Sequence, residues 1–114
     1  MNIVINGIGI VSSLGIGAEA TAEALRKGST GIRTMRYLQS QHTELPVGEV
    51  PLSNEEMMQM LNATSEGYVS RTALMGAIAL REALHSAGID ADLKGKRVCL
   101  ISGTTVGGMD KTER

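Results

Sequence analysis

The chain has 114 residues and suits a single domain, with 42% hydrophobic residues and a formal net charge of −1 at pH 7. Its 11 basic and 12 acidic residues form no long run of one sign, which argues against nucleic-acid binding, and its single cysteine excludes an internal disulfide and favours the reducing cytoplasm. No apolar run approaches the roughly 20 residues that span a bilayer, and no Lys or Arg precedes Arg26, so we expect neither a membrane segment nor a secretory signal.

The first element that the sequence predicts is a buried strand. Residues 2–11 are rich in β-branched side chains and lack the polar alternation of a half-exposed strand, so both faces of the strand should be covered. Good helix formers then dominate residues 18–27, which predicts a helix, and Gly28 stands at the C′ position where helices commonly end.

A glycine pattern lies between this strand and this helix. Gly7, Gly9 and Ser12 resemble part of a dinucleotide-binding loop, in which backbone amides hold a phosphate at a helix N-terminus. Ser12 replaces the third glycine, however, and no acidic residue ends a second strand about twenty residues later. Tight packing of the strand or a bulge is the favoured interpretation of the glycines, and a small nucleotide-binding α/β domain remains an alternative.

The middle of the chain is predicted to be a long loop followed by a short helix. Residues 29–52 keep no hydrophobic period, which predicts a loop with one short strand within 45–50. Ser53 and Glu56 fit a capping box, so a helix should begin there and run through Leu61. Packing in a core or a lid explains the methionines of this helix better than an adaptable contact surface does; they are Met57, Met58 and Met60.

The strongest helical pattern covers residues 70–87, where apolar residues form one broad face. Gly88 ends this helix at the C′ position, and Gly76 inside it indicates a neighbouring backbone that passes close. Residues 97–103 then predict a second buried strand. This order predicts an α/β arrangement in which a right-handed crossover joins 2–11 to a parallel, adjacent strand at 97–103.

Few side chains suggest a catalytic centre. The glycine-rich turn at residues 103–108 follows the second strand at its carboxyl end, where open α/β sheets bind ligands, but a purely structural turn fits the spacing equally well. Cys99 lies inside an apolar segment, where a buried thiol is inert. His42 and His85 have no partner at a metal-binding spacing, so we expect neither a catalytic role for them nor a metal site.

Five segments, taken in chain order, resemble the opening of the β-ketoacyl-acyl-carrier-protein synthases. They are residues 3–15, 24–32, 48–50, 70–90 and 98–109. The first segment is similar to the family's T-G-x-G-x-V-[ST]-x-x-G, with Asn6 where Thr is usual. The second segment is similar to its A-L-x-x-G-x-S-G-I, and the third is similar to its G-E-V. The fourth ends like the family's A-L-x-x-A-G-[LI]-D, and the fifth is similar to its strand and G-[ST]-x-x-G-G turn. Each segment is short, but together they cover nearly the whole chain in the right order.

The resemblance implies an α/β chain that forms the N-terminal part of a thiolase-like, layered α-β-α-β-α fold, with residues 1–114 as an incomplete portion of the synthase N-terminal domain. It also implies an acyltransferase that catalyses decarboxylative Claisen condensation of an acyl thioester with malonyl-acyl carrier protein, in fatty-acid or polyketide-type synthesis. The family's nucleophilic cysteine and its two catalytic histidines lie downstream of the matched region. We therefore expect no catalytic residue, cofactor or metal in this chain, and no activity from the chain alone.

The resemblance places one functional region in the chain. In the family, the turn that corresponds to Thr105, Val106 and Gly107 lines the acyl pocket near the dimer interface, and the expected substrate-binding residues here are these three with Gly108. An aliphatic side chain at the place of Val106 helps to set the acyl-chain length, and a small valine would leave room. The implied partners are acyl carrier protein and acyl or malonyl thioesters.

Two further expectations concern association with other chains. A partial sheet leaves strand edges and helix faces exposed, so we expect self-association or a homo-oligomer. The rival interpretation of the resemblance is a non-catalytic partner of the chain-length-factor type, which would bind an active synthase and shape its pocket.

Overall fold

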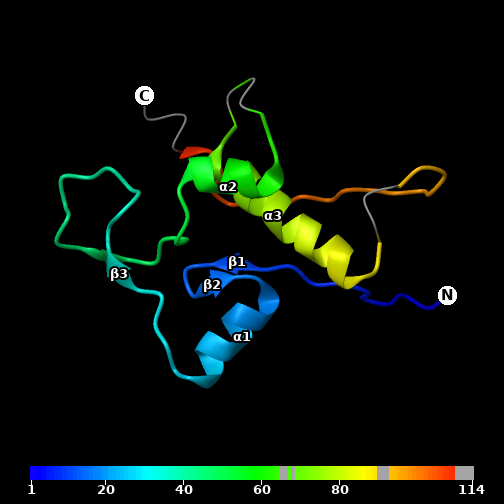
Figure 1. Ribbon diagram of the computed structural model, residues 1–114, viewed down its shortest axis with the longest axis horizontal. Helices are drawn as coiled ribbons and strands as arrows, with labels where there is room; N and C mark the ends of the chain where they lie inside the picture. Colours follow the sequence, from blue (N-terminus) through cyan, green and yellow to red (C-terminus); the bar gives the residue numbers. More distant parts are fainter. Residues whose placement is uncertain (65–66, 68, 90–92, 110–114) are drawn as a thin grey trace.

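The computed structural model describes residues 1–64, 67, 69–89 and 93–109. Its elements are β1 (Val11–Ser12), β2 (Gly15–Ile16), α1 (Ala18–Arg26), β3 (Arg33–Thr34), β4 (Pro46–Val47), α2 (Asn54–Leu61) and α3 (Arg71–Ser86). Helix α3 crosses the middle of the molecule and packs against α2 (Figure 1). The hairpin of β1 and β2, followed by α1, lies on the other side of α3.

The three predicted helices are confirmed, and local sequence explains where they begin and end. In the capping box, Ser53 accepts a hydrogen bond from the Glu56 amide at 3.1 Å, and Glu56 accepts one from the Ser53 amide at 2.7 Å. Ser70 caps α3 by accepting an amide of its first turn at 3.2 Å. Gly28 and Gly88 follow α1 and α3 with φ of 64° and 65°, a left-handed conformation that glycine adopts without steric cost.

The hydrophobic core is small and lies where α2 meets α3. Among the described residues, its buried members are Met57 from α2 and Leu74 and Ile78 from α3. Val11 and Ile16 of the hairpin pack against this cluster. The core therefore consists mainly of helix packing, and the position of Met57 confirms the core interpretation for that methionine.

The two long strands that the sequence predicted are not present in the described part of the chain. Only position 11 of the first is strand; with Ser12 it forms β1, which pairs antiparallel with β2, Val11 opposite Ile16. Residues 97–103 belong to no strand. The predicted parallel pairing of 2–11 with 97–103 is therefore wrong for this structure. A strand satisfies its amides and carbonyls through a neighbouring strand, and neither segment has one here.

The short strand predicted within residues 45–50 is confirmed as β4, which pairs antiparallel with β3, Arg33 opposite Val47. The described chain thus holds two small antiparallel sheets beside three helices. This mixture is consistent with the α/β class, but the sheets are too small to display the layers of a thiolase-like fold.

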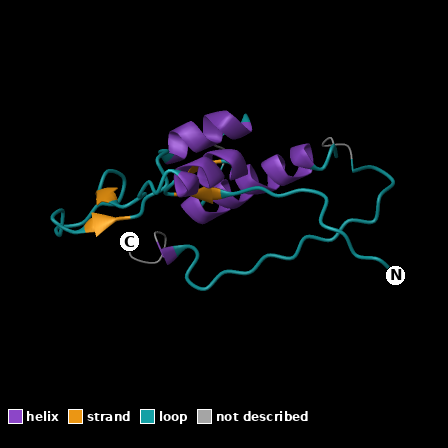
Figure 2. Ribbon diagram, turned by 90° about the horizontal axis from the view of Figure 1, so that it is seen from below, coloured by secondary structure: helices purple, strands orange, loops and turns teal. Residues whose placement is uncertain are grey.

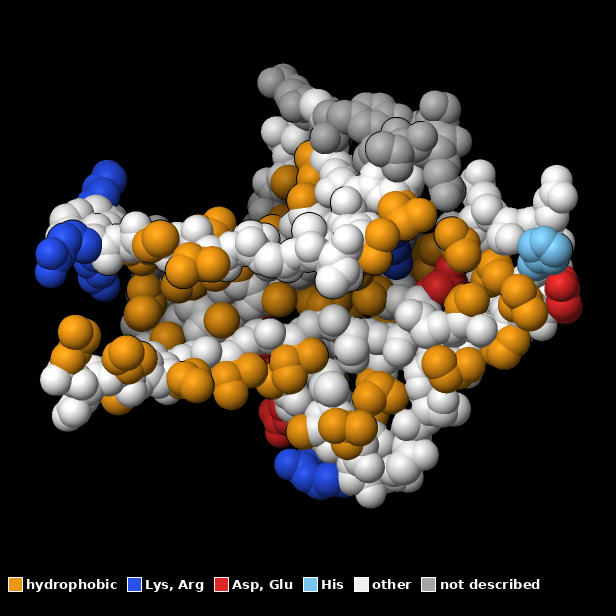
Figure 3. All heavy atoms as spheres, turned by 180° about the vertical axis from the view of Figure 1, so that it is seen from behind, with side chains coloured by type: hydrophobic (Ala, Val, Ile, Leu, Met, Phe, Trp, Pro, Cys, Tyr) orange, Lys and Arg blue, Asp and Glu red, His pale blue; other side chains and the backbone are white. Residues whose placement is uncertain are grey.

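Two segments that were expected to be strands run as extended arms instead. We call residues 2–6 the N-terminal arm and residues 97–103 the C-terminal arm; Figure 2 shows both as long stretches without helix or strand. Hydrophobic side chains are gathered along the extended parts of the molecule (Figure 3). Ile3 and Ile101 are each 90% exposed. Cys99 is exposed as well, so its predicted burial is wrong, because the strand that was to bury it has no neighbour.

Gly7 and Gly9 allow the chain to lie directly on α3. A Cβ atom at Gly7 would stand 2.0 Å from the carbonyl oxygen of Ala83, and one at Gly9 would stand 1.8 Å from that of Ala79. Both distances are far below van der Waals contact, so only glycine fits. Tight packing, the favoured interpretation of these glycines, is confirmed. The matching inference for Gly76 is wrong, because no atom outside the helix's own nearby backbone lies within 4 Å of the place that a Cβ would take.

The molecule exposes more surface than a compact chain of its size. Its accessible surface is 9137 Å². A compact monomer of 12.0 kDa would expose only about 6,000 Å². The excess of about 3,000 Å² comes with exposed apolar side chains on both arms, which identifies the arms as surfaces suited to contact with other protein segments.

Candidate functional site

The predicted acyl-pocket turn lies at the surface, next to the start of α3. The hydroxyl of Thr104 accepts the amide of Gly107 at 2.9 Å, and a Cβ at Gly107 would lie 3.2 Å from the methyl carbon of Thr72. Gly108 has φ of 90°, a conformation that favours glycine. Val106 is 64% exposed between these fixed points. The structure brings Thr105, Val106, Gly107 and Gly108 together in one turn. Helix α3 has two surface hollows beside its residue Glu82, and none of the four turn residues lines either of them.

Glu82 of α3 connects this helix to two separate parts of the N-terminal region by hydrogen bonds. One of its carboxylate oxygens accepts a hydrogen bond from the amide of Ile10 at 2.8 Å. The other accepts one from the amide of Ala18, in the first turn of α1, at 2.7 Å. One turn further along α3, Ser86 accepts the amide of Ile8 at 3.0 Å. Helix α3 therefore supplies the hydrogen bonds that a neighbouring strand would otherwise give to residues 8–10.

This arrangement bears on the nucleotide-binding alternative. In a dinucleotide site, a phosphate would accept the amides at the start of the helix that follows the glycines. Here the carboxylate of Glu82 accepts a hydrogen bond from the Ala18 amide, and the backbone of α3 occupies the space beside Gly7 and Gly9. A phosphate would meet a negative charge where it needs donors. The geometry thus argues against a nucleotide site at this loop.

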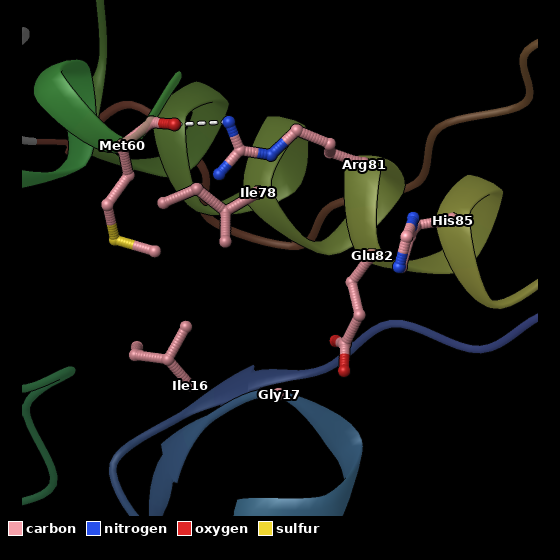
Figure 4. A pocket seen from close by; sticks show the side chains of 7 residues that line it. All are labelled: Ile16, Gly17, Met60, Ile78, Arg81, Glu82 and His85. Atoms are coloured by element: carbon pink, nitrogen blue, oxygen red, sulfur yellow. Dashed lines mark hydrogen bonds between the residues drawn. The ribbon is translucent and has the colours of Figure 1, made fainter. Parts of the chain in front are cut away.

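A hollow of about 380 Å³ lies between α3, the β2 turn and the end of α2. Figure 4 shows the side chains of Ile16, Met60 and Ile78 on its apolar side. The polar side carries Arg81, Glu82 and His85. Arg81 donates to the carbonyl of Met60 and Glu82 accepts two amides, so both polar groups next to His85 already have structural partners. The residues that line the hollow include no Ser, Thr, Cys or Lys that could act as a nucleophile, and we assign it no catalytic role.

A second polar cluster fixes the long loop. The carboxylate of Glu49 accepts three successive amides, from Arg36 at 2.6 Å, Tyr37 at 3.1 Å and Leu38 at 2.5 Å. Partial burial alone would raise the pKa of Glu49. The hydrogen bonds that it accepts from the backbone amides of Leu38, Arg36 and Tyr37, helped by the charge of Arg71, instead lower the pKa below its usual 4.5. Glu49 belongs to the G-E-V segment, whose resemblance to the family gave no sign of this role.

Arg71, at the start of α3, joins this cluster to the helices. Its guanidinium donates to the carbonyl of Val50 at 2.9 Å and to the side chain of Asn54 at 3.0 Å. It also lies 5.3 Å from the centre of the Tyr37 ring, and Arg36 lies at the same distance from that ring. The cluster holds the loop against α2 and α3, and its contacts indicate a structural role.

The remaining candidate side chains lie apart. His42 is 3.3 Å from the carboxylate of Glu44 in an exposed part of the loop, and His85 borders the hollow. Cys99 stands on the C-terminal arm. Within the described ranges, no group of three or more His, Cys, Asp or Glu side chains could hold a metal ion.

Comparison with known proteins identifies a family. A family model described as beta-ketoacyl synthase, N-terminal domain, matches residues 1–114. The curated proteins and the solved structures contain no match to the chain. In the described part of the chain, no helix has the length and apolar character needed to cross a membrane.

Proposed function

The chain belongs to the β-ketoacyl synthase family of condensing enzymes, and we propose that it forms the opening part of an acyltransferase that joins an acyl thioester to malonyl-acyl carrier protein. The observation that carries this proposal is the family match over all 114 residues. The order of the glycine turn, the three helices and the second glycine turn supports it.

The proposed reaction has two stages. A cysteine thiolate attacks the acyl thioester, the carrier thiolate leaves, and the acyl group becomes bound to the cysteine. The malonyl thioester then loses carbon dioxide, and the resulting enolate attacks the bound acyl carbonyl. A carbon–carbon bond forms, the cysteine thiolate is expelled, and a β-ketoacyl thioester results. Cys99, His42 and His85 do not share a site, so the proposal assigns these steps to residues outside this chain.

The contribution of this chain would be to shape the acyl pocket. Val106 stands in a turn that Thr104 and Gly108 hold in shape, and its side chain is largely exposed. In a complete condensing domain, such a side chain would contact the bound acyl chain, and its size would limit the chain length that fits.

A graft tests the proposal. Residues 1–114 would replace the corresponding opening of an active β-ketoacyl synthase, and the chimera would be assayed with acyl thioesters of rising length and malonyl-acyl carrier protein. We expect condensation by the chimera and none by the purified 114-residue chain. A folded chimera without condensing activity, or turnover by the chain alone, would contradict the proposal.

The same chimera tests the role of the turn. Val106→Phe should reduce kcat/KM for long acyl chains about tenfold or more while sparing short ones, because the larger ring fills part of the pocket. Leu38→Phe, at an exposed apolar position outside the turn, is the matched control and should change neither. An equal loss for short and long substrates would refute the assignment of Val106.

A further inference from the structure

We propose that Thr104 and Thr72 are positioning residues for the acyl-pocket turn. Thr104 closes the turn through its hydroxyl group, and Thr72 supports the turn from α3 through its methyl group. Together they fix how far the side chain of Val106 reaches, and so they help to determine which acyl-chain lengths are accepted. The inference rests on the proposed function and adds two residues that lie outside the expected substrate-binding positions at 105–108.

The hydroxyl group of Thr104 bridges the residue that it positions. Its oxygen accepts a hydrogen bond from the amide of Gly107 at 2.9 Å, so Thr105 and Val106 lie inside the ring that this bond closes. Serine and threonine cap helices through the same contact with the amide three residues along. Because the side chain of Val106 is 64% exposed, little packing holds it, and the closed backbone determines where it points.

Gly107 brings the turn against the start of α3. A Cβ atom at this position would lie 2.6 Å from the hydroxyl oxygen of Thr104 and 3.2 Å from the methyl carbon of Thr72. Both distances are shorter than an ordinary van der Waals contact, so the two threonines already occupy the space of a side chain there. The methyl group of Thr72 therefore faces the turn, and the glycine allows both threonines to approach it.

Thr72 can act as a fixed support because the start of α3 is anchored beside it. Ser70 caps the helix by accepting an amide of its first turn at 3.2 Å. Arg71 donates to the carbonyl of Val50 at 2.9 Å and to the side chain of Asn54 at 3.0 Å. A threonine in a helix has only two common χ1 rotamers, so the helix itself places the methyl group.

The two threonines use different halves of the same side chain, which provides paired substitutions with opposite expected outcomes. At position 104 the hydroxyl group acts, so Thr104→Val removes the contact and Thr104→Ser keeps it. At position 72 the methyl group acts, so Thr72→Ser removes the contact and Thr72→Val keeps it. Serine, threonine and valine have similar helix propensities, so a general loss of stability would not produce this reversal between the two positions.

The test uses the chimera described above, assayed with acyl thioesters of rising length. Thr104→Val should raise the ratio of kcat/KM for long chains to that for short chains about fivefold, because the freed turn lets Val106 move aside. Thr72→Ser should raise this ratio about threefold, because the turn loses its contact with a methyl group. Thr104→Ser and Thr72→Val are the matched controls and should keep the parent ratio. In a Val106→Ala chimera neither threonine should influence the ratio, since the side chain that they position is absent.

Hydrogen exchange of the Gly107 amide gives a second readout that needs no activity. In the 114-residue chain, Thr104→Val should speed this exchange about fivefold, and Thr104→Ser should leave it at the wild-type rate. Equal exchange in all three chains would overturn the inference and leave the proposed function standing. So would an active chimera in which valine has the same effect at both positions, or a shift that persists beside Val106→Ala. An inactive parent chimera would contradict the proposed function, and the inference would fall with it.

Discussion

The packed helices and the two arms of this molecule carry similar apolar side chains, but these are buried in the helices and exposed on the arms. Leu74 and Ile78 are buried between α2 and α3, whereas Ile3 and Ile101 are each 90% exposed. A helix satisfies its backbone within its own residues and needs a partner for only one face. A strand needs a neighbour for its backbone as well as its side chains. The comparison shows that the arms lack a partner, while their composition still suits burial.

The largest expected effect sharpens this comparison between buried and exposed residues. Leu74→Ala should lower the free energy of unfolding by about 3 kcal/mol, because it removes buried methyl groups and leaves a cavity at the centre of a small core. Ile101→Ala is the control and should change it by less than about 0.5 kcal/mol. Urea denaturation followed by circular dichroism measures both. Equal effects would show that the C-terminal arm is packed in solution.

The glycines give a second test, on how the chain beyond the N-terminal arm meets α3. Gly9→Ala should destabilise the protein by about 2 kcal/mol, because its Cβ would stand 1.8 Å from the Ala79 carbonyl oxygen and the backbone must move. Gly76→Ala should instead stabilise it by about 1 kcal/mol, because the position lies inside α3 with open space around it. The same denaturation assay applies. A neutral Gly9→Ala would mean that the segment does not rest on the helix.

These contrasts explain how much of the structure could be predicted from the sequence. The helices were predictable because their signals are local: Ser53 and Glu56 are three residues apart and cap the helix that they begin. The long strands were not, because their pairing depends on segments elsewhere. The expected burial of Cys99 was wrong for the same reason. The site residues follow the same division, since the turn at Thr105 is local, whereas Glu82 contacts amides 64 and 72 residues away.

The smallest expected effect concerns Glu49, which holds the loop by accepting hydrogen bonds from three backbone amides. Because the pKa of Glu49 in the folded chain lies below its usual 4.5, its ionised form adds stability above that pH. This stability is lost as the pH falls through the lowered folded pKa. Glu49→Gln should therefore cost about 1 kcal/mol at pH 7, a modest value because the group is near solvent.

The pH dependence separates this carboxylate from one that only carries surface charge. Urea denaturation of the wild-type chain between about pH 3 and pH 7 should show a loss of stability in acid that Glu49→Gln reduces, since glutamine does not titrate. Glu44→Gln is the control, because Glu44 is exposed and contacts His42 instead of backbone amides. If both variants kept the full acid dependence, the three amides would not be the cause. Glu49 would then be a surface charge, and the loop would be held by Arg71 and its contacts alone.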